Sequence, residues 1–62
     1  MLAKDVKVGD VVEHLTSIGY VTKVEADKMW AIWSWYSWEE LYLPSYEPVR
    51  LVQTSSHEDA PR

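Results

Sequence analysis

The amino-acid sequence predicts an all-β protein, a small five-stranded barrel with a flexible C-terminal tail. Short runs of β-branched and aromatic residues recur along residues 6–52, and polar or proline-containing turns separate them. Each run is long enough for a strand but too short for a typical helix. The chain has 62 residues, and short strands in so small a chain are arranged most economically as a barrel.

The first half of the chain contains the three strands with the clearest signals. A Gly-Asp turn signal at residues 9–10 leads into the first predicted strand, residues 11–15 (VVEHL). The second strand is expected at residues 20–24, and the polar residues 25–28 have the right length for a hairpin loop. Residues 29–35 (MWAIWSW) predict the third strand, because β-branched and aromatic bulk without helix caps favours a strand over a helix.

The second half of the chain alternates irregular segments with two shorter strands. Residues 36–40 predict a loop with one helical turn, which Ser37 would cap. Residues 41–43 predict the fourth strand, ended by a proline, and residues 49–52 predict the fifth. The final segment, QTSSHEDAPR, has almost no apolar bulk and therefore predicts a flexible tail.

The same pattern predicts the domain organisation and the core. One barrel domain is expected at residues 1–52 and a polar tail at residues 53–62. Apolar side chains that alternate along the strands share the inner face of the barrel. The expected core residues are Val11, Val21, Val24, Met29, Trp33, Leu51 and Val52.

Composition and charge disfavour several classes of function. Ten acidic residues stand against six basic ones, giving a net charge of −4. The basic residues are scattered and form no stripe, which argues against a nucleic-acid-binding protein. No apolar run approaches the roughly 20 residues of a membrane helix, and the first residues do not resemble a secretory signal. No membrane association and no secretion by a signal peptide are therefore expected.

Catalysis, metal binding and cofactor binding are not expected either. The chain has no cysteine, and His14 and His57 have no neighbours at metal-ligand spacing, so His14 is interpreted as a surface residue. No nucleophile elbow and no glycine-rich phosphate loop are present. A domain this small also lacks a second layer that could enclose a deep pocket, so the sequence favours a protein that is not an enzyme.

Four segments resemble those of SH3-like and KOW-like small barrels. Residues 7–12 (KVGDVV) are similar to the turn into their first strand, and residues 19–24 (GYVTKV) are similar to their second strand. Residues 29–33 (MWAIW) and 49–52 (VRLV) are similar to their third and closing strands. The resemblance covers about residues 6–52 and points in particular to the small SH3-like proteins encoded by tailed bacteriophages. It implies an SH3-like barrel located in a virion or in the cytoplasm of the host cell.

Aromatic residues are concentrated between Trp30 and Tyr46. Successive side chains of a strand point to opposite faces, so Met29, Ala31, Trp33 and Trp35 are expected to share one face. The resemblance places Met29 and Trp33 inside, which leaves Trp30 and Ile32 outside. An apolar outer face needs cover, either from the chain's own segments or from a partner. The candidate protein-binding residues are Trp30, Ile32, Trp35, Tyr36, Trp38 and Tyr42.

These observations favour a non-enzymatic structural or assembly module, a small virion-associated phage protein that docks through its aromatic strand face. Its partner would be another protein or a second copy of the chain. The alternative is a soluble adaptor or inhibitor that binds a host or phage protein. A cation-binding aromatic cage is a further alternative, with Trp35, Trp38 and Tyr42 as the rings and Glu39 or Glu40 as the acid. Aromatic residues also bind proline-rich segments in SH3 domains.

Overall fold

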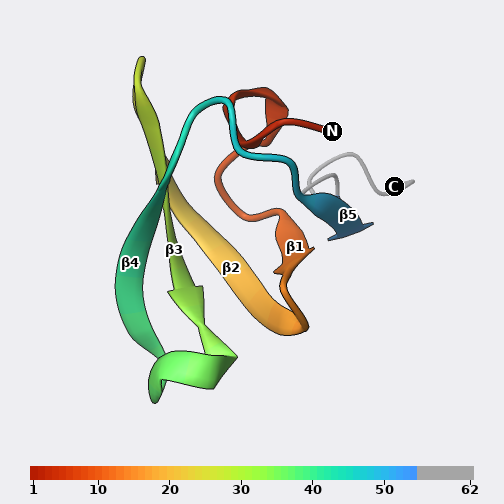
Figure 1. The fold of residues 1–62 in the computed structure, drawn as a ribbon, viewed down its shortest axis with the longest axis vertical. Helices are drawn as coiled ribbons and strands as arrows, with labels where there is room; N and C mark the ends of the chain where they lie inside the picture. The colour runs from red at the N-terminus through yellow and green to blue at the C-terminus, as the bar shows by residue number, and fades with distance from the viewer. Residues whose placement is uncertain (55–62) are drawn as a thin grey trace, which may run out of the picture.

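The computed structural model describes residues 1–54, which form a curled antiparallel β-sheet (Figure 1). The strands within this range are β1 (Val11–His14), β2 (Ser17–Val24), β3 (Lys28–Trp33), β4 (Glu39–Pro44) and β5 (Arg50–Gln53). Two short 3-10 turns accompany them, η1 (Ala3–Asp5) and η2 (Ser34–Tyr36). The prediction of an all-β fold with five strands is confirmed.

The strands pair in the order β4-β3-β2-β1-β5, so the first four form a meander. The turn between β1 and β2 contains only Leu15 and Thr16, because His14 pairs directly with Ser17. The segment 34–38 joins β3 to β4, and the pairing of these strands ends where Trp33 lies opposite Glu39. β5 is reached through a longer connection and pairs with the free side of β1.

Two irregularities in the pairing bend the sheet. One lies in β2, where Thr22 is the extra residue between Val21 and Lys23. The other lies in β5, where Val52 is the extra residue opposite the step from Val11 to Val12 of β1. Extra residues of this kind increase the local twist and bend a strand. β4 and β5 nevertheless remain the two edges of the sheet and do not pair with each other. The described strands thus form an open, curled sheet, whereas a closed barrel was expected.

One end of the curled sheet is covered by the N-terminal strap, residues 1–5. The backbone N–H of Ala3 donates to the carbonyl of Glu47 at 2.8 Å, and the N–H of Val49 donates to the carbonyl of Met1 at 2.7 Å. Ala3 is fully buried, so η1 covers the core at this end. Figure 1 shows the strap beside the connection from β4 to β5, with the β1–β2 turn and η2 at the opposite end.

The hydrophobic core lies on the concave side of the sheet. Its buried residues are Ala3, Val6, Val12, Val21, Met29, Ala31, Trp33 and Val49. Val21, Met29 and Trp33 were predicted there. Val24 and Leu51, also predicted, are partly buried and pack against the core.

The core prediction was wrong for Val11 and Val52. In β1 it is Val12 that faces the core, and it lies directly opposite Leu51 on β5. Val11 therefore points to the other face of the sheet, because neighbouring residues of a strand face opposite ways. The register shift beside Val12 leaves Val52 45% exposed. Two adjacent valines give no indication of which one faces inward.

Several element boundaries also differ from those expected. The third strand ends at Trp33, so Trp35 lies in η2 and does not share the inner face with Met29 and Trp33. The helical turn expected to start at Ser37 is instead a 3-10 turn that precedes this residue. β4 begins at Glu39, which places both acidic residues of the expected loop in a strand.

The expected tail lies mostly beyond the part of the chain that the structure describes. Gln53 is the last residue of β5, one position past the expected end of the domain. Residues 55–62 are outside the described range.

Candidate functional site

The six candidate binding residues fall into two groups. Trp30 and Ile32 of β3 and Tyr42 of β4 lie on the convex face of the sheet, which we call the outer face. Trp35 and Tyr36 form most of η2, and Trp38 follows shortly after it. The fold therefore separates residues that the sequence analysis treated as one docking face.

The outer-face group is largely covered by its own neighbours. Trp30 lies opposite Tyr42, with ring centroids 5.1 Å apart and an interplanar angle of 59°. The Trp30 Nε1–H donates to Glu25 Oε1 at 3.1 Å. This hydrogen bond and the one from Lys23 hold the pKa of Glu25 below its ordinary value. Lys28 Nζ lies 5.1 Å from the Tyr42 ring centroid. Trp30 is thus half-buried and has polar and aromatic partners within the chain.

The β1–β2 turn and the segment 34–38 lie together at the end of the sheet opposite the strap, which we call the open end. Three hydrogen bonds join the segment 34–38 to this turn and to the first residues of β2. They run from Ile18 N to Ser34 Oγ (3.0 Å), from Trp35 N to Ser17 Oγ (3.2 Å) and from Trp35 Nε1 to Thr16 Oγ1 (2.9 Å). The two segments consequently form one connected surface.

The backbone of the open end is strained. Among the described residues, those other than glycine with positive φ are Leu15 (50°), Thr16 (67°), Ser37 (58°) and Trp38 (61°). All of them belong to the open end. A left-handed conformation costs roughly 1–2 kcal/mol for a residue with a Cβ, and tight hairpins normally place Asn or Gly there. Strained conformations of this kind are concentrated at functional sites.

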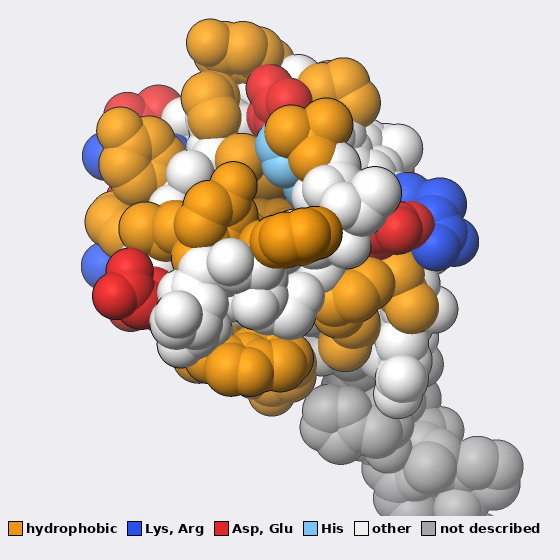
Figure 2. Space-filling model, turned by 60° about the horizontal axis from the view of Figure 1, so that its bottom comes forward, with side chains coloured by type: hydrophobic (Ala, Val, Ile, Leu, Met, Phe, Trp, Pro, Cys, Tyr) orange, Lys and Arg blue, Asp and Glu red, His pale blue; other side chains and the backbone are white. Residues whose placement is uncertain are grey.

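The open end also exposes large apolar side chains. Leu15 is 79% exposed, Trp35 65%, Trp38 64% and Tyr36 54%. Figure 2, which brings this end of the molecule forward, shows hydrophobic side chains gathered over it. Single exposed apolar residues are normal on soluble proteins, but a contiguous group of them marks an interaction site.

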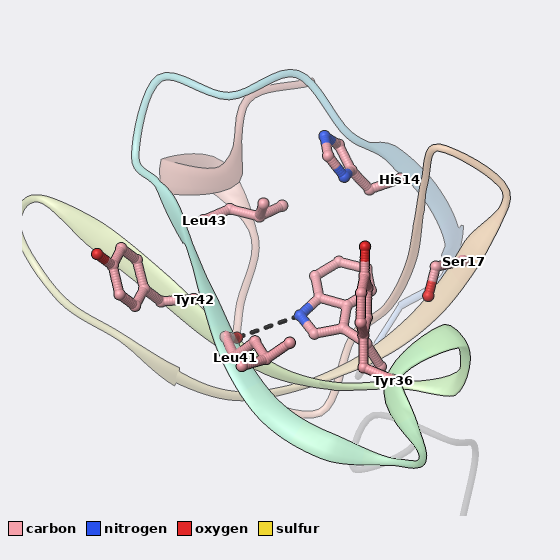
Figure 3. A pocket seen from close by; sticks show the side chains of 7 residues that line it. His14, Ser17, Tyr36, Leu41, Tyr42 and Leu43 are labelled. Carbon is pink, nitrogen blue, oxygen red and sulfur yellow. Dashed lines mark hydrogen bonds between the residues drawn. The ribbon is translucent and has the colours of Figure 1, made fainter.

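A cavity of about 250 Å³ opens at this end, between β4 and the β1–β2 turn. Its lining residues are His14, Ser17, Trp33, Tyr36, Leu41, Tyr42 and Leu43. Figure 3 shows Leu41 and Leu43 on one wall and His14 and Ser17 on the other. Trp33 also lines the cavity, and its Nε1–H donates to the carbonyl of Leu41 at 3.1 Å. On the β4 side the cavity is bordered by an edge strand, because β4 pairs only with β3 among the described strands.

The polar group that dominates the cavity is His14. It was expected on the surface, but its side chain is only 17% exposed and its ring lies edge-on to Trp33 at 6.1 Å. The Nε2–H of His14 donates to Glu47 Oε2 at 2.7 Å. Glu47 belongs to the connection between β4 and β5, so this bond joins β1 to that connection. No lysine or arginine is among the described residues that line the cavity.

The proposed aromatic cage is not assembled in this structure. Within residues 1–54, ring contacts join His14 to Trp33 and Trp30 to Tyr42, and none joins Trp35 or Trp38 to Tyr42. Trp35 is turned toward Thr16, and Tyr42 lies on the outer face. The ring set that the sequence suggested is therefore divided between two surfaces.

Sequence reasoning missed two parts of the site. The exposed Leu15 was assigned to the end of a strand, although it occupies the tip of a turn. His14 and the two leucines of β4 were not recognised as cavity residues. Leu15 and Thr16 stand at the boundary between the first two predicted strands, where a turn is needed. Neither residue type is typical of a left-handed turn, so the sequence gives no signal for its conformation.

Two absences apply to the part of the chain that the structure describes. No group of three His, Cys, Asp or Glu side chains within it is arranged to hold a metal ion. None of its helical segments is long and apolar enough to cross a membrane.

Comparisons with protein-family models, with curated proteins and with solved structures each found no match. The strained and apolar open end is therefore the observation on which a functional proposal rests.

Proposed function

We propose that the protein is a non-enzymatic assembly module that docks onto a partner protein through the exposed apolar surface of its open end. The observation that carries this proposal is the hydrogen-bonded pair of strained segments that holds Leu15, Trp35 and Trp38 in solvent. None of these side chains belongs to the hydrophobic core, whose buried aromatic residue is Trp33. Because these side chains are exposed, their burial does not stabilise the fold and cannot offset the backbone strain of the open end.

The composition of this surface suits a protein interface. Tryptophan and tyrosine are enriched at interface hot spots, where each contributes a large and rigid contact area. The hydrogen bond from Trp35 to Thr16 limits the conformational freedom of the indole before any partner arrives. A side chain that is already ordered loses less entropy when it is buried.

The setting that we propose is a phage particle, because the sequence resembles the small SH3-like proteins of tailed phages. The curled five-stranded antiparallel sheet is compatible with an SH3-like fold, and only this fold part of the proposal has structural support. A free adaptor or inhibitor is the alternative, and the acidic surface, with a net charge of −4, favours a basic target in that case. Purified particles distinguish the two, since an assembly component is present in them in many copies.

Site-specific photo-crosslinking in the producing cell tests the docking surface. A photoreactive residue at position 38 should give a discrete adduct with one partner, identified by mass spectrometry. The same residue at position 4, exposed in the strap at the other end, should not.

A pair of matched variants completes the test. With the photoreactive residue moved to position 35, Trp38→Asn should reduce the adduct. Tyr46→Ser should leave it unchanged, because Tyr46 is 71% exposed but lies in the β4–β5 connection near the strap. Equal crosslinking from both ends, or loss of the adduct in both variants, would refute docking through the open end.

A further inference from the structure

The free edge of β4 forms one wall of the cavity. β4 pairs with β3 alone among the described strands, so its other edge has no partner strand. Three consecutive residues, Leu41–Leu43, line the cavity. Figure 3 shows the side chains of Leu41 and Leu43 on the cavity side and that of Tyr42 turned away, so the backbone between them lies at the rim. An unpaired edge presents N–H and C=O groups that can pair with an extended chain.

The cavity is suited to one apolar side chain. Its surface is mostly apolar, with Leu41, Leu43 and Trp33 among the lining residues, and its volume is about 250 Å³. A strand added to the edge of β4 would direct alternate side chains toward the concave side, where the cavity lies. The edge and the cavity would thus be occupied by the same segment.

The acidic residue at the start of β4 adds a charge requirement. Glu39 lies directly opposite Trp33, so it is on the concave face with Leu41 and Leu43. Its side chain is exposed and takes part in none of the ion pairs or side-chain hydrogen bonds found within residues 1–54. Glu40 faces the other way and accepts a hydrogen bond from Thr22 Oγ1 at 2.6 Å. Glu39 is therefore the carboxylate available beside the cavity.

We propose that the β4 edge binds an extended segment of the partner protein as an added antiparallel strand. One apolar side chain of that segment enters the cavity, and a lysine or arginine two residues later lies against Glu39. The spacing follows because the concave-facing residues of β4 are 39, 41 and 43, and an antiparallel partner reverses their order. This inference rests on the proposed function and specifies the chemistry of the partner.

A synthetic peptide tests this pairing with the full chain. The probe is a short polythreonine peptide with one leucine and, two positions later, one lysine. Three control peptides carry glutamate in place of the lysine, the two residues in reverse order, or proline between them, which removes a backbone donor. Binding of the probe should slow hydrogen exchange of the β4 amides. Each control peptide should bind more weakly, and the proline peptide should give no protection.

Two neighbouring glutamates provide a matched pair of variants. Glu39→Gln should weaken binding of the probe by up to about fivefold, the range measured for exposed ion pairs, and the loss should disappear at high salt. Glu40→Gln should leave the affinity unchanged, because that carboxylate faces away from the cavity. Leu41→Trp should fill the cavity while the domain stays folded. The probe should then bind no more tightly than a peptide with threonine in place of its leucine.

The possible results separate this inference from the proposed function. Protection confined to the open-end turns would overturn the β4 pairing, as would equal effects of Glu39→Gln and Glu40→Gln. Concentration-dependent dimerisation with protected β4 amides and no response to the probe would assign the edge to a second copy and would also overturn it. None of these results alters the crosslinking from position 38, which tests docking at the open end independently.

Discussion

Replacing Gly19 with alanine should destabilise the protein, although alanine is ordinarily more favourable than glycine within a strand. Gly19 of β2 lies directly opposite Trp33 of β3, and the indole ring passes over it. A Cβ at position 19 would lie 2.5 Å from Cζ3 and 2.6 Å from Cε3 of Trp33. Carbon atoms in favourable contact are about 3.5–4.0 Å apart. The ring or the strand therefore has to move.

The size of the effect follows from what holds the ring in place. Trp33 Nε1 donates to the Leu41 carbonyl, and the ring meets the edge of His14, so a shift disturbs both contacts. Overpacking of this kind destabilises a protein by about 1–3 kcal/mol. Alanine also loses less conformational entropy than glycine on folding, which stabilises the folded state by about 0.5–1 kcal/mol. We expect a net loss of about 1–2 kcal/mol in the free energy of unfolding for Gly19→Ala.

Urea denaturation of a double-mutant cycle measures this effect. The cycle comprises the wild type, Gly19→Ala, Trp33→Leu and the double variant. With leucine at position 33 the added methyl group meets no ring, so Gly19→Ala should become neutral or stabilising in that background. The coupling should therefore be about 1 kcal/mol or more. If alanine at position 19 stabilises the wild type, or acts equally in both backgrounds, the steric argument is refuted.

Three further predictions concern the outer face and the open end. Trp33→Ala should cost about 3–5 kcal/mol as a core truncation, and Trp30→Ala should cost less because Trp30 is half-buried; chemical denaturation compares them. The lowered pKa of Glu25 means that its stabilising effect is complete above the ordinary value of 4.5 and is lost as pH falls through the lowered one. The stability difference between wild type and Glu25→Gln should therefore shrink in acid, and a difference independent of pH would contradict the assignment. Leu15→Asn should raise stability by about 1 kcal/mol in thermal melts, since Asn tolerates the left-handed conformation, and should weaken docking. A loss of stability would show that Leu15 packs better than its exposure indicates.

The sequence predicts β3 best. The period of two along a strand places Met29, Ala31 and Trp33 on one face, and the resemblance to SH3-like barrels predicts that this face points inward. All three residues are buried. β4 was predicted too short, because Glu39 and Glu40 have low strand propensity. They are extended because they pair with Trp33 and Ile32 of β3.

The candidate site was less predictable because it depends on non-local geometry. His14 shares the inward face of β1 with Val12, so its orientation was missed when Val11 was assigned to the core. The two-residue turn at Leu15 and Thr16 was missed because these residue types do not favour its conformation. The cavity follows from an unclosed sheet, and neither a bulge nor an open seam leaves a periodic signal in the sequence. The aromatic residues were recognised as candidates from composition, but their division between two surfaces became visible only when β3 was seen to end at Trp33.

The two ends of the sheet should also differ in when they form during folding. The strap contacts join residues far apart in the chain, as in the bond from the Met1 ammonium to the Val49 carbonyl, which spans 48 positions. The open end is built from adjacent hairpins, whose loop-closure entropy is small. We therefore expect the hairpins to form early and the strap to dock last, and to be among the first parts to detach in native-state fluctuations. Transient release of the strap would then leave the proposed docking surface at the open end intact, so the docking that we propose would not require the strap to be in place.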